Sequence, residues 1–186
     1  MKRIMFDDRF CLTEAVLNGT KTMTRRLAPK DFNPSDFRSD LEFIRRYAHF
    51  HVGEVIAVAQ SYSNLGIEFV DYADPTFKKK RLPKWGFTRR MKGWKNKMYV
   101  RADVMPNQIK ITGVRFERIQ DISNDDCQRE GIVRADYDIW GYKQNGRYYS
   151  FHSGKDAYAS LIKKLIGKKA WHANPYVFVY TFELVK

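Results

Sequence analysis

Hydrophobic residues follow two periodicities along this chain, and each periodicity predicts a different kind of element. Apolar and polar positions alternate through residues 108–118 and 176–185, which predicts two long strands. The β-branched run in residues 52–59 predicts a turn followed by a buried strand. Residues 156–166 instead place apolar side chains on adjoining helical rows and end at Gly167, which predicts an amphipathic helix.

Shorter segments complete the predicted order of elements. Ser123 followed by acidic residues is typical of a helix start, and that helix is expected to end at Gly131. Further helical segments are predicted at residues 13–18 and 42–47, and further strands at 4–6, 65–70 and 98–103. The mixture predicts an α+β fold. The final strand carries large residues on one face and small ones on the other, which suits a small β-barrel covered outside by a helix.

Residues 19–26 break both periodicities, because they place three hydroxyls and three cations in eight positions. The helix expected at 13–18 ends at Asn18 and Gly19, a pair that favours a left-handed exit. The octet is therefore expected to leave the helix as a loop or an irregular strand start, with groups free to bind a ligand. The alternative is a solvated basic turn.

Charge points to a polyanionic partner, because the 186 residues carry a formal net charge of +13. Residues 78–101 contain eleven Lys and Arg and no acid, with two tryptophans and a phenylalanine interleaved. Cations for phosphates and flat rings for bases predict a surface for single-stranded nucleic acid rather than duplex. The alternative is a solvated loop whose tryptophans dock on the barrel. The residues of this run chosen as candidate contacts are Arg89, Arg90, Lys92, Lys95 and Arg101.

Other classes of protein find little support in the sequence. No apolar stretch approaches the length of a membrane span, and the first residues lack the apolar core of a signal peptide, so a cytoplasmic protein without a membrane partner is expected. His49 and His51 alternate but have no further ligand nearby, so no metal site is predicted. Neither a phosphate-binding glycine loop nor a Ser-His-Asp set is indicated, and no cofactor is expected. The sequence leaves the oligomeric state open.

The octet Gly-Thr-Lys-Thr-Met-Thr-Arg-Arg resembles the signature of the ASCH domain family, a PUA-like family with members of phage and prophage type. Three later segments resemble pieces of that family in the same order. They are residues 97–103, the run Ile-Gln-Asp-Ile-Ser at 119–123 followed by Glu130 and Gly131, and Trp171 with Asn174, Pro175 and the final strand. The resemblance covers most of the chain. It implies a PUA-like mixed β-barrel with flanking short helices, formed by one domain over 1–186 with insertions near 28–50, 61–97 and 132–155.

The resemblance also implies an activity. Some ASCH proteins act as amidohydrolases on N4-acetylcytidine and are taken to use a lysine, a threonine three residues later and a distant glutamate. Carried over by motif, these residues fall on Lys21, Thr24 and Glu130. A threonine hydroxyl needs a base to take its proton, and a lysine can be that base only if its pKa is lowered. Burial and two neighbouring arginines would lower the pKa of Lys21, and Glu130 would raise it.

Two other functions stay open beside deacylation: a non-catalytic module that binds RNA or reads a modified base, and a ribonuclease. In each case RNA or a modified nucleoside is the expected ligand. The additional residues predicted to contact it are Thr22, Arg25, Arg26, Trp171 and Asn174. For the last two, a structural interpretation is favoured, in which Trp171 plugs the barrel end and Asn174 caps a turn.

Spacing sets a geometric condition on the proposed set of three. Residues three apart share a face on a turn but point to opposite sides of a regular strand. The exit at Asn18 and Gly19 favours a turn, so we expect Lys21, Thr24 and Glu130 to converge in one pocket.

Overall fold

The computed structural model describes residues 1–29, 40–65, 92–136 and 138–185. The chain forms two compact units. Unit 1 comprises Met1–Phe6, Val55–Ile109 and Val185–Lys186, and unit 2 comprises Asp7–Glu54 and Lys110–Leu184. Most of the candidate site residues lie in unit 2, whereas the described part of the basic run lies in unit 1.

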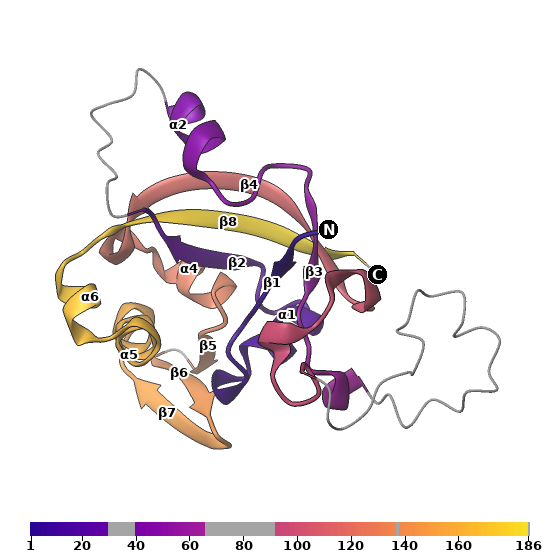
Figure 1. The fold of residues 1–186 in the computed structure, drawn as a ribbon. Helices are drawn as coiled ribbons and strands as arrows, with labels where there is room; N and C mark the ends of the chain where they lie inside the picture. The colour runs from indigo at the N-terminus through magenta and orange to yellow at the C-terminus, as the bar shows by residue number, and fades with distance from the viewer. Residues whose placement is uncertain (30–39, 66–91, 137, 186) are drawn as a thin grey trace. The chain divides into compact units, whose positions relative to one another are not determined.

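The described residues contain two β-sheets and several short helices, which confirms the predicted α+β class. The larger sheet has the strand order β1 (Arg3–Ile4), β3 (Val55–Val58), β4 (Gln108–Arg118), β8 (Tyr176–Val185) and β2 (Met23–Leu27). The smaller sheet has the order β5 (Val133–Asp136), β6 (Ile139–Gln144) and β7 (Arg147–Phe151). Figure 1 shows β8 running between β4 and β2.

The predicted closed barrel is wrong for the described part of the chain. The larger sheet is open, because β1 and β2 end its hydrogen-bonded order and do not pair with each other. Alternation along a strand specifies which face is buried, but closure needs the two edge strands to meet with matching tilt and register. Here both edge strands are short, with two residues in β1 and five in β2.

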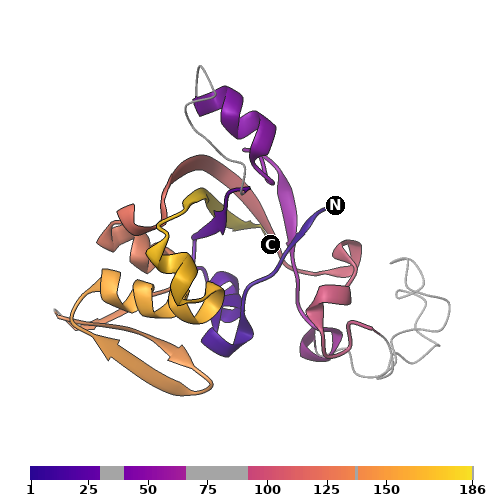
Figure 2. The same ribbon diagram turned by 60° about the vertical axis from the view of Figure 1, so that its left-hand side comes forward.

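In unit 2, the strands β2, β8 and β4 form a layer between helices. Helix α2 (Asp40–Tyr47) lies on one side, and α4 (Asn124–Arg129) and α5 (Gly154–Ile166) lie on the other (Figures 1 and 2). On the α2 side, the ring of Phe43 stacks on Phe178 and meets Phe116 edge-on. The side facing α4 and α5 carries the charged residues described below.

Several predicted elements are confirmed with small shifts in their ends. The helix expected at 13–18 is α1 (Leu12–Leu17), and the strands at 55–58, 108–118 and 176–185 are β3, β4 and β8. Ser123 and Ser153 cap α4 and α5, since their side chains accept hydrogen bonds from the backbone N–H groups of Asp126 and Asp156. The helix α6 (Lys168–His172) and the β5, β6 and β7 sheet were not predicted. The 3₁₀ turns are Asp8–Phe10, Tyr62–Leu65, Lys97–Tyr99, Ala102–Val104 and Ile119–Asp121.

The strand predicted at 98–103 is wrong, because two of these 3₁₀ turns occupy that segment. Asn96 caps the first turn by accepting a hydrogen bond from the N–H of Met98, and the hydroxyl of Tyr62 accepts one from the N–H of Arg101. These bonds satisfy backbone groups that a strand would have paired with a neighbour. The strand predicted at 65–70 falls almost wholly outside the described residues.

Within the described ranges, no helix is long and apolar enough to cross a membrane.

Candidate functional site

The octet at 19–26 begins as a turn and continues as a regular strand. The N–H of Lys21 donates to the carbonyl of Ala15, and the N–H of Thr22 donates to the carbonyl of Arg129. From Met23 onward the chain is β2, which pairs antiparallel with β8. A solvated basic turn is wrong for the centre of the octet, because Lys21 is only 2% exposed and Thr24 and Arg25 are also buried.

Lys21 and Glu130 form a buried pair at the meeting point of β2 and α4. The Nζ atom of Lys21 lies 2.6 Å from Oε2 of Glu130 and 2.6 Å from its backbone carbonyl oxygen. Glu130 is the C-cap of α4, where a cation stabilises the free carbonyls and the negative end of the helix. Lys21 therefore compensates for a carboxylate at the unfavourable end of the helix dipole.

Gly131 permits this close approach. Its φ of 99° lies in the left-handed region. A Cβ at this position would meet the side chain of Leu12 at 3.3 Å and that of Lys21 at 3.6 Å. A larger residue would be strained by the positive φ and would crowd Leu12, whereas its Cβ would make an ordinary van der Waals contact with Lys21.

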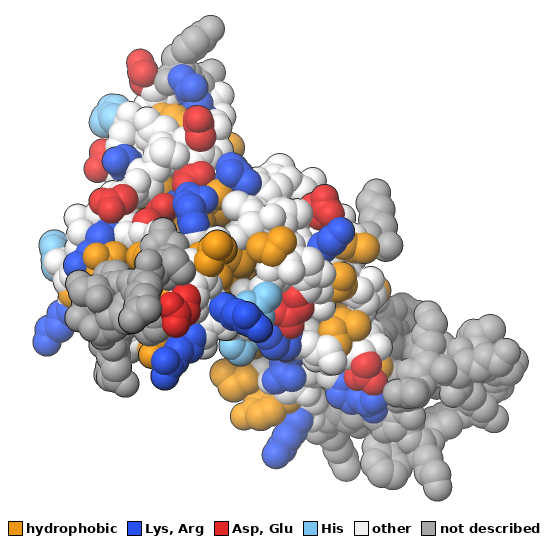
Figure 3. All heavy atoms as spheres, turned by 90° about the horizontal axis from the view of Figure 1, so that it is seen from above, with side chains coloured by type: hydrophobic (Ala, Val, Ile, Leu, Met, Phe, Trp, Pro, Cys, Tyr) orange, Lys and Arg blue, Asp and Glu red, His pale blue; other side chains and the backbone are white. Residues whose placement is uncertain are grey.

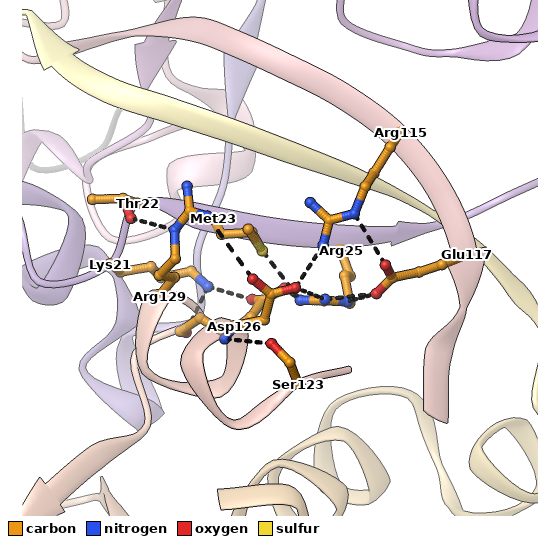
Figure 4. Close-up of polar contacts among 10 residues, drawn as sticks. Lys21, Thr22, Met23, Arg25, Arg115, Glu117, Ser123, Asp126 and Arg129 are labelled. Atoms are coloured by element: carbon orange, nitrogen blue, oxygen red, sulfur yellow. Dashed lines mark hydrogen bonds and ion pairs between the residues drawn. The ribbon is translucent and has the colours of Figure 1, made fainter. Parts of the chain in front are cut away.

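Arg25 extends the pair into a larger network. Its Nη1 lies 3.1 Å from Oε1 of Glu130, while Nε and Nη2 lie 2.9 and 2.6 Å from Oε1 of Glu117. Its Nη2 also lies 2.8 Å from Oδ2 of Asp126. Arg115 contacts the same two carboxylates, Glu117 and Asp126, from β4. We call the set the ionic cluster (Figure 4); its members are Lys21, Arg25, Arg115, Glu117, Asp126, Arg129 and Glu130.

Burial controls the protonation of the cationic side chains. Burial lowers the pKa of Lys21 from its ordinary value, although the charge of Glu130 acts in the opposite direction. Arg25 and Arg26 lower the pKa of Lys21 further through their positive charge. Burial also lowers the pKa of Arg26, whereas the pKa of Arg25 is raised because the carboxylates outweigh its burial. A lysine with a lowered pKa is the base that the predicted chemistry requires.

Thr24 occupies a different position from the other two predicted catalytic residues. It pairs with Tyr180 in the sheet, and strand alternation places it with Arg26 on the face opposite Met23 and Arg25. The structure thus brings Lys21 and Glu130 together, and the convergence of Thr24 with them stays a prediction.

The residues of the octet predicted to bind nucleic acid are held by the protein itself. Thr22 accepts a hydrogen bond from Nε of Arg129 at 3.4 Å. The guanidinium of Arg25 contacts three carboxylates, so a phosphate would have to compete with them.

Trp171 and Asn174 are both tied to Gln120. Oδ1 of Asn174 accepts a hydrogen bond from the backbone N–H of Gln120 at 3.1 Å. The backbone carbonyl of Trp171 accepts one from the side-chain amide of Gln120 at 2.8 Å. The indole ring of Trp171 meets Tyr158 edge-on, with centroids 6.2 Å apart. These contacts hold both residues within the protein, and Asn174 takes a left-handed φ of 45° before Pro175. Trp171 packs on α5, and the described residues form no closed barrel end for it to plug.

Sequence reasoning missed four residues around the pair: Arg115, Glu117, Asp126 and Tyr158. Arg115 and Glu117 lie two apart on β4, a spacing that places both on one face and could have signalled a charged strand face. Tyr158 of α5 lies beside Arg25, whose Cζ is 5.8 Å from the ring centroid. Its hydroxyl is buried without a hydrogen-bond partner among the described residues, and burial raises its pKa.

The predicted basic surface is described only in part. Arg89 and Arg90 lie outside the described residues. Lys92 and Lys95 are exposed in unit 1, and Nζ of Lys92 lies 5.8 Å from the ring centroid of Tyr99. Arg101 pairs with Asp103 at 2.5 Å. On the face that Figure 3 shows, Lys and Arg side chains are interspersed with acidic ones.

The described residues contain no group of three or more His, Cys, Asp and Glu side chains that could hold a metal ion. No protein-family model, curated protein or solved structure matches this chain.

Proposed function

We propose that this chain is a PUA-like protein of ASCH type that removes the acyl group from N4-acylated cytosine, in a nucleoside or in RNA. The observation that carries the proposal is the buried pair of Lys21 and Glu130, 2.6 Å apart, in which burial lowers the pKa of the lysine. A base with a lowered pKa, held by a carboxylate in direct contact, is an arrangement that general acid–base catalysis uses. The free thiols of Cys11 and Cys127 fit the reducing cytoplasm expected from the sequence.

The proposed reaction begins with a neutral amine on Lys21, the form that the lowered pKa of this residue makes accessible. The Glu130 carboxylate holds the Lys21 nitrogen in place. Lys21 takes the proton of the Thr24 hydroxyl, and the Thr24 oxygen attacks the acyl carbonyl. The Lys21 ammonium then gives this proton to N4 of cytosine as the C–N bond breaks, so that cytosine leaves as a neutral amine and Lys21 is again neutral.

The second half of the reaction restores the enzyme. Lys21 takes a proton from water as the water oxygen attacks the acyl ester on Thr24. Lys21 gives that proton to the Thr24 oxygen as the ester bond breaks, and the free acid departs. Arg26 shares a strand face with Thr24, which supports a role for its guanidinium in stabilising the negative oxygen of the intermediate.

Turnover tests this proposal directly. The protein is incubated with N4-acetylcytidine, and cytidine is detected by chromatography. Lys21→Met and Thr24→Ala are expected to lower turnover at least about 100-fold, and Thr24→Ser to keep part of the rate. The matched control is Glu117→Gln, which removes a partner of Arg25 but leaves both partners of the catalytic pair in place. Wild-type protein without turnover, or Lys21→Met with full turnover, would contradict the proposal.

A non-catalytic reader of RNA or modified bases is the second candidate. The observation that favours it is the position of Thr24, which lies on the strand face opposite Arg25. In a reader, the ionic cluster would hold β2 and α4 together and shape a binding surface. Binding of N4-acetylcytidine without release of cytidine, together with a modest effect of Lys21→Met on affinity, would favour this candidate.

A further inference from the structure

The β5, β6 and β7 sheet has one face buried in unit 2. Trp140, Tyr142 and Phe151 share this face in the strand register, and the ring of Trp140 lies close to Gly154 of α5. Figure 1 shows α5 over the small sheet. The hydroxyls of Tyr142 and Ser160 lie 2.9 Å apart across this contact. Tyr158, on the same helix, lies beside Arg25, so α5 separates the small sheet from the ionic cluster.

The opposite face of the small sheet is exposed and carries apolar side chains. The strand register places Val133, Ile139 and Tyr148 on this face, and they are 52%, 42% and 43% exposed. Three large apolar side chains on one open sheet face are a surface that a partner can cover.

The tip of the Tyr148 ring lies over Gly141 of the neighbouring strand. A Cβ at Gly141 would come within 2.7 Å of Cζ and 2.8 Å of the hydroxyl oxygen of Tyr148. The absence of a side chain at Gly141 therefore lets the ring lie across β6. One side of the ring rests on the strand, and the exposed side offers an aromatic surface of the kind on which sheet proteins stack unpaired bases.

The charge around this ring favours a polyanion over a protein partner. The strands β6 and β7 carry no Asp or Glu, whereas Lys143 stands opposite Tyr148 and Arg147 precedes it in the chain. Lys143 is exposed and stands directly opposite Tyr148 in the register. A cation beside an open ring is the pairing that single-stranded nucleic acid requires, because each nucleotide offers a flat base and a phosphate.

We propose that the exposed face of the β5, β6 and β7 sheet binds single-stranded nucleic acid, with Tyr148 stacking on a base and Lys143 contacting a neighbouring phosphate. This surface differs from the basic run at 78–101, and it does not depend on the deacylation proposed above.

Fluorescence anisotropy with a short, labelled single-stranded RNA of mixed sequence, repeated at several salt concentrations, tests the proposal. Tyr148→Ala is expected to weaken binding at least about five-fold, since loss of a base stack costs that much or more. Tyr148→Phe keeps the ring and should bind as the wild type does. Lys143→Gln should weaken binding and lower the slope of log affinity against log salt by about one.

Lys110→Gln is the matched control, because Lys110 is an exposed lysine on β4 outside this face, and its loss should leave the salt slope unchanged. Circular dichroism confirms folding of each variant, and turnover of N4-acetylcytidine by Tyr148→Ala should equal that of the wild type. An inactive wild type would contradict the deacylation alone, because the binding measurement needs no turnover.

Two results would overturn the inference. The first is equal RNA affinity of wild type and Tyr148→Ala, which includes the case in which neither binds. The second is a wild-type dimer in light scattering that Tyr148→Ala converts to a monomer, because the face would then pair with a second copy of the chain.

Discussion

Replacement of Glu130 by Gln tests the electrostatics of the ionic cluster without a large change in shape. The carboxylate neutralises two buried cations, since Oε2 contacts Lys21 and Oε1 contacts Arg25. Removing one partner of a buried ion pair costs about 3–5 kcal/mol, because the remaining charge stays out of water. We therefore expect Glu130→Gln to lower the free energy of unfolding by about that amount at neutral pH.

The loss should depend on pH, and the sign follows from Lys21. Its pKa in the folded protein is below its ordinary value of 10.5, so the unfolded chain binds more protons between the two values and stability rises with pH there. Glu130 raises the pKa of Lys21, so the pKa of Lys21 is lower still in the Glu130→Gln variant. The pH range over which stability rises therefore begins at a lower pH in the variant than in the wild type. The difference in free energy of unfolding between wild type and variant should narrow as the pH rises from about 7 toward 10, by at most about 1.4 kcal/mol per pH unit.

Urea unfolding followed by circular dichroism at a series of pH values measures this gap. Glu117→Gln is the control, because it removes a partner of Arg25, which keeps its proton throughout this range, and it leaves Lys21 paired. Its stability deficit should stay constant with pH. The reasoning is refuted if Glu130→Gln is as stable as the wild type at neutral pH, or if its deficit is as independent of pH as that of the control.

Three further predictions concern residues around the site and the basic run. Tyr158→Phe should leave the melting temperature unchanged or raise it, because the hydroxyl is buried without a partner among the described residues; a clear drop would reveal a hydrogen bond. Trp171→Ala should lower the melting temperature more than RNA affinity, since the ring packs on Tyr158; intact melting with lost binding would assign the ring to the ligand. Joint replacement of Arg89, Arg90, Lys92 and Lys95 by Gln should flatten the salt dependence of RNA binding. An unchanged slope would show that these four residues of the basic run lie outside the interface.

Local patterns in the sequence were sufficient for the long elements. The strands β4 and β8 and the helix α5 follow directly from alternation and helical spacing, and Ser123 marks the start of α4. These features depend on the stereochemistry of neighbouring residues and on which face of an element is apolar, so a short window of sequence contains the information.

Segments without periodicity were decided by their tertiary partners. The octet could be a loop or a strand by its own composition, and its second half becomes β2 because β8 lies beside it with free backbone groups. The segment 133–152 had no predicted elements, yet it forms strands that bury Trp140 and Tyr142 against α5. In both places, the energy that selects the conformation comes from residues distant in sequence.

The site shows the same division between sequence and structure. Resemblance to a known signature selected Lys21 and Glu130 from the sequence, but their contact joins residues 109 positions apart and depends on where α4 ends relative to β2. Glu117 and Asp126 look like ordinary surface acids in the sequence. They belong to the site because the packed chain excludes water around Arg25, which both carboxylates contact. Only the folded chain excludes water in this way, so no local pattern of residues predicts it.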